Sequence, residues 1–150
     1  MYVKCEILSV NKCLNLFCVA VIEENVATTL RGAKVIQGEY RERLLDENTT
    51  TYDMENGYTR HIIADANDQG IVVELGTINI INHIKILLWD RDTRSYFYFV
   101  EVSVDQEQWE RVIDHTKCNC RSWQFLHFPA RPVKYIKLVG THNTENKVIA

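Results

Sequence analysis

The stretch IKILLWDRDTRSYFYFVEVSVDQEQW, residues 84–109, decides the fold class of this chain. Two apolar runs, residues 84–89 and 96–104, are rich in β-branched and aromatic residues, and a charged segment separates them. This pattern predicts two strands joined by a loop. In the second run every other residue from Tyr96 to Val104 is apolar or aromatic, whereas Glu101 and Ser103 fall on the opposite face. We therefore expect one buried face and one partly solvated face.

The second half of the chain continues this pattern. Short apolar runs bounded by turn-forming residues predict further strands at residues 71–75, 111–114, 123–128 and 133–139. Pro129 and Pro132 lie between the last two runs, and proline has no backbone N–H for a strand ladder, so we expect a loop there. Residues 24–66 are less regular and predict long loops. With no helical period in any window, the sequence predicts an all-β domain, a jelly-roll β-sandwich.

Composition limits the size, the partners and the compartment of the domain. The chain has 150 residues, 46% hydrophobic and 25% charged, which fits one globular domain. Its net charge of -3 and its scattered lysines and arginines argue against a nucleic-acid partner. Its five cysteines are an odd number, and Cys118 and Cys120 would share one face of a strand, where they are poorly placed to pair. A reduced, cytoplasmic setting is therefore expected.

The N-terminal segment, residues 1–22, is assigned less clearly. Its apolar run CLNLFCVAVI, residues 13–22, has the length of a signal-peptide core but only Lys4 and Lys12 as a positive flank. The run is too short to span a bilayer. The alternatives are a signal peptide, an upstream segment outside the domain and an extra edge strand.

Three segments resemble the discoidin, or F5/8 type C, domain family. They are WDRD-x-RSY-x-YF at residues 89–99, RSWQ at residues 121–124 and GTHNT at residues 140–144. The resemblance implies a galactose-binding-domain-like jelly roll over residues 23–150, with the family's last strand missing at the C-terminal end. Within the family, the chain resembles the discoidin domains of BTB/POZ proteins. The BTB module of such proteins is thought to dock on a cullin-3 ubiquitin ligase, which implies a substrate-binding role for this domain.

The first candidate binding loop follows residues 84–89. Planar cations, carboxylates and aromatic rings are the groups that dominate binding hot spots. Alternatively, the carboxylates pair with the arginines to stiffen a hairpin while the tryptophan covers the core. The candidate contacts in this loop are Trp89, Asp90, Arg91, Asp92, Arg94 and Tyr96.

Two further loops are expected at the same end of a discoidin domain. One carries Tyr58, Arg60 and His61, where packing and turn formation are the favoured alternative roles. The other carries His142 and Asn143, whose imidazole and amide groups suit contact with a peptide backbone or a sugar. The alternative for this segment is a polar turn capped by its own side chains.

Catalytic and metal motifs are not found in the sequence. It has no nucleophile elbow, phosphate-binding glycine loop or histidine metal motif. His115, Cys118 and Cys120 provide fewer ligands than a closed zinc site needs. Asp46 and Asn48 resemble a position where some discoidin domains hold calcium, but locking of the loop by backbone hydrogen bonds is favoured. We expect no enzyme activity, no cofactor and no metal.

The sequence therefore predicts a non-enzymatic protein-recognition module, whose partner is a ubiquitination substrate reached through the three loops. Cullin-3 would be contacted only through a BTB module, which these 150 residues do not contain. One alternative is a domain that binds glycans or phospholipid headgroups. The polar tip at residues 91–94 argues against membrane binding, because membrane-inserting loops carry exposed apolar side chains. The other alternative is a structural domain that packs against a sister discoidin domain.

Overall fold

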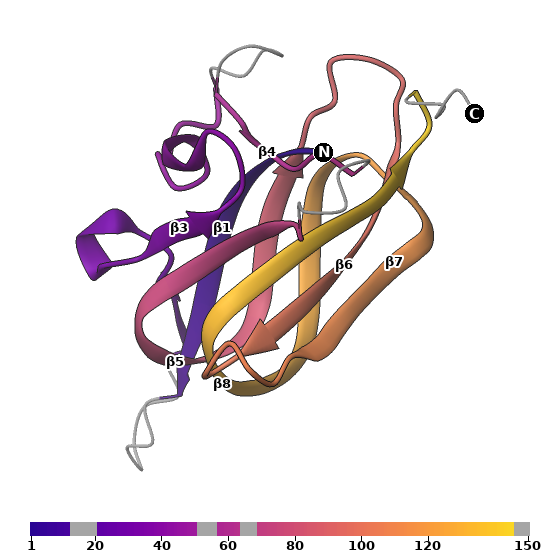
Figure 1. Ribbon diagram of the computed structural model, residues 1–150. Helices are drawn as coiled ribbons and strands as arrows, with labels where there is room; N and C mark the ends of the chain where they lie inside the picture. Colours follow the sequence, from indigo (N-terminus) through magenta and orange to yellow (C-terminus); the bar gives the residue numbers. More distant parts are fainter. Residues whose placement is uncertain (13–20, 51–56, 64–68, 146–150) are drawn as a thin grey trace.

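The computed structural model describes residues 1–12, 21–50, 57–63 and 69–145 (Figure 1). Within these ranges the chain forms strands and two short 3₁₀ helices, and no α-helix. The elements are β1 (Tyr2–Lys12), β2 (Val21–Asn25), η1 (Thr29–Arg31), β3 (Lys34–Gln37), η2 (Arg41–Arg43), β4 (Thr59–Arg60), β5 (Ile71–Leu88), β6 (Tyr96–Ser103), β7 (Glu110–Cys120) and β8 (Ser122–Asn143). The predicted all-β fold class is confirmed.

The strands form an antiparallel arrangement in the order β2-β1-β5-β8-β6-β7. β3 pairs with β5, and β4 pairs with β1. β1 lies in the segment that the sequence left uncertain, and it pairs with β5 on one side and β2 on the other. This part of the N-terminal segment therefore supplies a strand to the sheet, whereas residues 13–20 lie outside the described residues.

β5 and β8 are each one long strand where the sequence predicts two short ones. They pair along their lengths, from Ile71 opposite Leu138 to Leu88 opposite Ser122. Pro129 and Pro132 lie inside β8, so the loop predicted around them is wrong. The ladder shifts register twice in this region, and such bulges bend a strand and leave positions where proline is tolerated.

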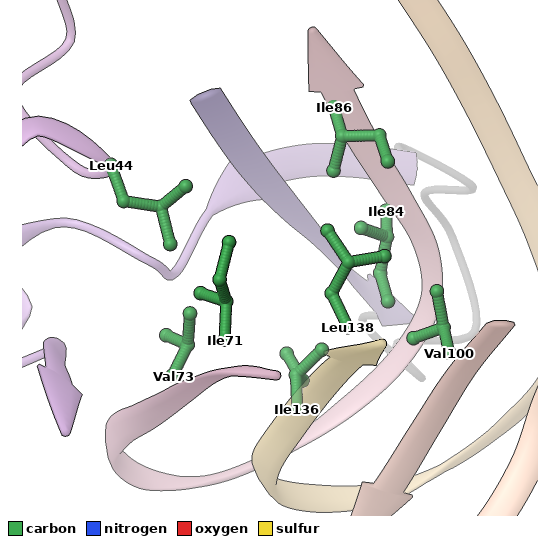
Figure 2. Close-up of a pocket in the computed structure, with 8 residues that line it drawn as sticks. All are labelled: Leu44, Ile71, Val73, Ile84, Ile86, Val100, Ile136 and Leu138. Atoms are coloured by element: carbon green, nitrogen blue, oxygen red, sulfur yellow. The ribbon is translucent and has the colours of Figure 1, made fainter. Parts of the chain in front are cut away.

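The bend folds the sheet into a sandwich. Ile71 and Val73 come from the first part of β5, and Ile84 comes from its second part, yet all three line one apolar cavity of about 20 Å³ (Figure 2). Two parts of one strand therefore face each other across the core. The remaining lining residues are Leu44, Ile86, Val100, Ile136 and Leu138.

The predicted alternation along β6 is confirmed up to the end of the strand. Tyr96, Tyr98, Val100 and Val102 are all buried. Val104 was expected on the same face but is 44% exposed, because β6 ends at the residue before it. Ser103, which the alternation placed on the solvated face, is buried, and its hydroxyl accepts backbone N–H groups from the turn that follows.

Candidate functional site

The three segments predicted as loops meet at one end of the sandwich (Figure 1). Arg60 lies in β4, and His142 and Asn143 lie at the end of β8, so the loops predicted at these residues are wrong and their side chains come from strands. Val3 of β1 pairs with Thr59 of β4 and with Leu88 at the end of β5. Tyr96, at the start of β6, pairs with Asn143 at the end of β8. We call this region the loop end and define it as residues 57–63, 89–95 and 139–145.

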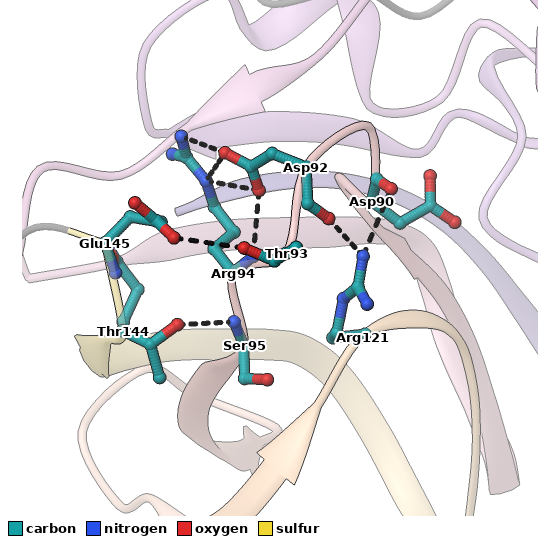
Figure 3. Close-up of polar contacts among 9 residues, drawn as sticks. Asp90, Asp92, Thr93, Arg94, Ser95, Arg121, Thr144 and Glu145 are labelled. Carbon is teal, nitrogen blue, oxygen red and sulfur yellow. Dashed lines mark hydrogen bonds and ion pairs between the residues drawn. The ribbon is translucent and has the colours of Figure 1, made fainter.

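The loop at residues 89–95 is braced by an ion pair within itself (Figure 3). Nε of Arg94 donates to both carboxylate oxygens of Asp92 at 3.0 and 2.8 Å, and its Nη2 lies 2.6 Å from Oδ2. The backbone N–H of Arg94 also donates to Oδ1 of Asp92, at 2.9 Å. The guanidinium carbon of Arg94 lies 4.6 Å from the centre of the Trp89 ring. Arg94 therefore stiffens the loop. This is the structural role that was predicted for the arginines as the alternative to ligand binding.

The pair is ionised at neutral pH. The hydrogen bond from Arg94 holds the pKa of the Asp92 carboxyl below its usual range, although partial burial opposes this effect. The same hydrogen bond raises the pKa of Arg94. Because each charge is offset by the other, neither side chain adds a net charge to the surface.

Arg121 is a site residue that the sequence analysis missed. Its guanidinium donates to the backbone carbonyl of Asp92 and, at 3.4 Å, to that of Asp90 (Figure 3). Arg121 belongs to the RSWQ segment, which is one of the segments that resemble the family. The contact between Arg121 and the loop depends on the pairing of Ser122 with Leu88. The residues around Arg121 do not by themselves show which residue of β5 lies opposite Ser122.

Further hydrogen bonds tie the loop to the last residues of β8. The backbone N–H of Ser95 donates to Oγ1 of Thr144 at 2.9 Å, and the N–H of Thr144 donates back to the carbonyl of Ser95 at 3.1 Å. The Thr93 hydroxyl donates to Oε1 of Glu145 at 3.2 Å. Residues 89–95 and 139–145 therefore form one connected surface.

The loop at residues 57–63 joins this surface from β4. Nε2 of His61 donates to the backbone carbonyl of Gly140 at 3.2 Å, and the backbone N–H of His61 donates to the carbonyl of Met1. Arg60 pairs with Glu39 at 2.5 Å and lies over the Tyr40 ring. His61 thus links the β4 loop to the end of β8.

The predicted contact residues divide into exposed and buried groups. Arg91 and His142 are exposed, and Asp90, Asp92, Arg94 and Arg60 are half-buried. The His142 ring packs against Phe97, with 5.3 Å between ring centres. The remaining residues shape the loop end from beneath, since their side chains are buried: Trp89, Tyr96, Tyr58, His61 and Asn143.

A polar cluster lies where β6 pairs with β7. Nδ1 of His115 lies 3.1 Å from the Tyr98 hydroxyl and 3.4 Å from Sγ of Cys120. Burial raises the pKa of both the Cys120 thiol and the Tyr98 hydroxyl, so both groups stay protonated. The cluster therefore holds hydrogen bonds and presents no thiolate nucleophile.

The loop that follows η2 is locked as expected. Oδ1 of Asp46 accepts the backbone N–H of Asn48 at 3.0 Å, and Oδ1 of Asn48 accepts that of Thr50 at 3.1 Å. These bonds are the short-range side-chain to backbone type that locks turns without a metal. Among the described residues, no group of three or more His, Cys, Asp or Glu side chains is placed to hold a metal ion. No helix in those residues is long and apolar enough to cross a membrane.

Comparison with known proteins agrees with the observed fold. The F5/8 type C domain model matches residues 32–150. BTB/POZ domain-containing protein 9 of Drosophila melanogaster is 63% identical over 126 residues, which cover 84% of this chain and 18% of that protein. The Homo sapiens protein of the same name is 55% identical over 135 residues, which cover 90% of this chain and 22% of that protein. This chain thus spans about a fifth of the length of these relatives.

The fold is shared with a solved carbohydrate-binding module. Chitosan-binding module 1 from the chitosanase/glucanase of Paenibacillus sp. IK-5 superposes with a TM-score of 0.56 at 23% identity, covering 80% of this chain and 88% of that chain. At that identity the likeness concerns the fold alone. The matched family model, the relatives and the sandwich agree, and the chain belongs to the F5/8 type C, or discoidin, domain family.

Proposed function

We propose that this chain is a non-enzymatic recognition module that binds a protein partner at the loop end. The partner would be a substrate of a cytoplasmic cullin-3 ubiquitin ligase for which a BTB protein is the adaptor. The likeness to BTB/POZ domain-containing protein 9 supports this assignment. Cullin-3 itself would be held by a BTB module, so this chain would perform only the choice of substrate.

One observation carries the proposal: one loop and two strand ends that are far apart in the sequence form one braced surface. The Asp92–Arg94 pair, the Arg121 hydrogen bonds and the Ser95–Thr144 bonds all act on residues 89–95. A surface fixed before binding loses less conformational entropy when a partner docks. This rigidity is the property expected of a binding site on a β-sandwich scaffold.

Exposed arginines at and beside the loop end suit an acidic ligand. Arg91 of the loop end and the adjoining Arg121 are both exposed, the carboxylate of Asp92 is paired with Arg94, and that of Glu145 accepts the Thr93 hydroxyl. The planar guanidinium group suits recognition of carboxylates. We infer a partner segment that carries acidic groups, with aromatic groups able to stack on the arginines.

A glycan ligand is less well supported by the same surface. Sugar rings commonly stack on exposed aromatic side chains. Tyr58 and Trp89 are the only Phe, Tyr or Trp residues within the described loop end, and both are buried. The exposed groups there are mainly charged or hydroxyl-bearing, which suits a polypeptide.

The proposal is tested by affinity capture from cell lysate with quantitative mass spectrometry. The test variant is Arg91→Ala/His142→Ala, which removes two exposed side chains and leaves the Asp92–Arg94 brace in place. The control is Arg31→Ala, because Arg31 is an exposed arginine on η1 whose ion pair with Glu24 lies at the surface. Circular dichroism first establishes that all three proteins are folded.

Proteins retained by the unmodified chain and by Arg31→Ala, but lost from the loop variant, would support the proposal. Equal capture by all three proteins would contradict it. In that case a glycan array and binding to a sister discoidin domain test the two alternative functions directly.

A further inference from the structure

The first part of β8, residues 122–128 with the sequence SWQFLHF, forms an outer edge of the folded sheet. One side of this segment pairs with residues 83–88 of β5. β6 joins the other side of β8 only from Tyr135 onward. Within the described part of the chain, no strand pairs with the second side of residues 122–128. This segment, which we call the β8 edge, therefore presents a row of unpaired backbone N–H and C=O groups.

Aromatic side chains line the outer face of the β8 edge. Trp123, Phe125 and His127 occupy alternate positions, so they lie on one face of the strand. Phe125 is 60% exposed, His127 is exposed and Trp123 is half-buried. Nζ of Lys85 on β5 lies 4.2 Å from the centre of the Trp123 ring and 5.8 Å from that of Phe125. These cation–π contacts hold two of the rings in place beside the unpaired backbone groups.

The β8 edge lacks the charges that other outer strands carry. Residues 122–128 contain no Asp, Glu, Lys or Arg, and no Pro or Gly. At the two ends of the strand order, β2 carries Glu23 and Glu24, and β7 carries charged residues from Glu110 to Lys117. Charged side chains on an outer strand oppose the addition of another strand, whereas an uncharged apolar edge favours it. Compared with β2 and β7, the β8 edge is therefore suited to accept a further strand.

We propose that the β8 edge pairs antiparallel with the same edge of a second copy of this chain. A two-fold axis through Phe125 places its ring opposite that of the second copy, and places Trp123 opposite the partner's His127. Aromatic rings directly opposite each other stabilise antiparallel strands. Because each His127 faces a tryptophan, no like charges meet across the axis, and the segment is complementary to itself. Each chain contributes the same segment, so the contact closes as a dimer and does not grow into a fibre.

Sedimentation velocity from about 10 µM to about 1 mM chain tests the proposal, because a pair of short strands is a small contact and forms a weak dimer. A reducing buffer prevents the exposed thiol of Cys118 from linking two chains. The test variant is Phe125→Lys, which places two positive charges at the two-fold axis. The matched control is Leu30→Lys, because Leu30 on η1 is 96% exposed and lies outside the β8 edge. Circular dichroism establishes that both variants are folded.

We expect the unmodified chain to dimerise with a dissociation constant below about 1 mM, Phe125→Lys to associate at least about tenfold more weakly, and Leu30→Lys to associate as the unmodified chain does. Hydrogen–deuterium exchange at residues 122–128 should be slower in the dimer than in the diluted monomer. A chain that stays monomeric throughout would overturn the proposal, whatever other strand binds this edge. Equal association of Phe125→Lys and the unmodified chain, equal weakening by both substitutions, or unchanged exchange at residues 122–128 in the dimer would also overturn it.

Discussion

At the residue scale, the carboxylate of Asp92 holds the β5–β6 loop in one conformation. Replacing it in Asp92→Asn removes the ion pair with Arg94, which is partly open to solvent. We expect the free energy of unfolding at neutral pH to fall by less than about 1 kcal/mol, because screened ion pairs contribute little. Urea unfolding of both proteins measures this difference.

The pH dependence of that difference follows from the pKa of Asp92, which is lower in the folded chain than its usual value. A depressed carboxyl pKa stabilises the fold above the unfolded value of about 3.9, and the benefit is lost as the pH falls through the folded pKa. The gap between Asp92→Asn and the unmodified chain should therefore shrink as the medium is acidified. A gap that stays constant or widens would contradict this account.

Arg121 acts on the same loop from the opposite side, through backbone carbonyls. Arg121→Ala removes its hydrogen bonds to Asp90 and Asp92. We expect faster amide exchange at residues 90–95 and a loss of stability near 1 kcal/mol, the usual net value of a hydrogen bond. Hydrogen–deuterium exchange measures the effect, with Arg91→Ala as the control. Equal exchange in the two variants would show that Arg121 does not brace the loop.

Contacts within the candidate site were predictable from the sequence where they join residues close together in the chain. The charged loop and its internal Asp–Arg pairing follow from residues adjacent in the chain. The alternation along β6 also placed Tyr96 on the buried face, and burial of Trp89 was one of the two roles predicted for it. Arg121 was missed because it reaches the loop through pairing between β5 and β8.

At the element scale, β5 and β8 are continuous because bulges absorb the irregular residues between their apolar runs. The sequence predicts the apolar runs correctly, and it treats the residues between them as loops. Local propensity identifies prolines and glycines as breaks, whereas a bend in a paired strand accommodates both. The number of strands was therefore harder to predict than their composition.

The turn after η1 packs closely against the bend in β5. A Cβ atom on Gly76 would lie 3.0 Å from the carbonyl carbon of Arg31 and closer still to its oxygen. Gly76→Ala should therefore displace η1 and lower the free energy of unfolding by about 1 to 3 kcal/mol. Thermal unfolding measures this loss, with the neighbouring exposed substitution Thr77→Ala as the control. Equal melting temperatures of the two variants would contradict the close packing.

At the scale of the whole molecule, stability depends on the layer of aliphatic side chains between the two parts of the folded sheet. Ile84 is 1% exposed and lines the central cavity, whereas Ile78 on the same strand is 57% exposed. We expect Ile84→Ala to lower the free energy of unfolding by about 2 to 5 kcal/mol. Ile78→Ala should change it by less than about 0.5 kcal/mol. Similar losses from both substitutions, measured by urea unfolding, would contradict the sandwich.

The central claim is that the loop end is the surface that binds a partner. Hydrogen–deuterium exchange of the chain, with and without a protein captured in the lysate experiment, tests this claim most directly. Slower exchange on binding at residues 57–63, 89–95 and 139–145, with the β6–β7 turn unchanged, is the predicted result. Protection confined to the β6–β7 turn or to the outer faces of β5 and β8, with the loop end unchanged, would contradict the claim.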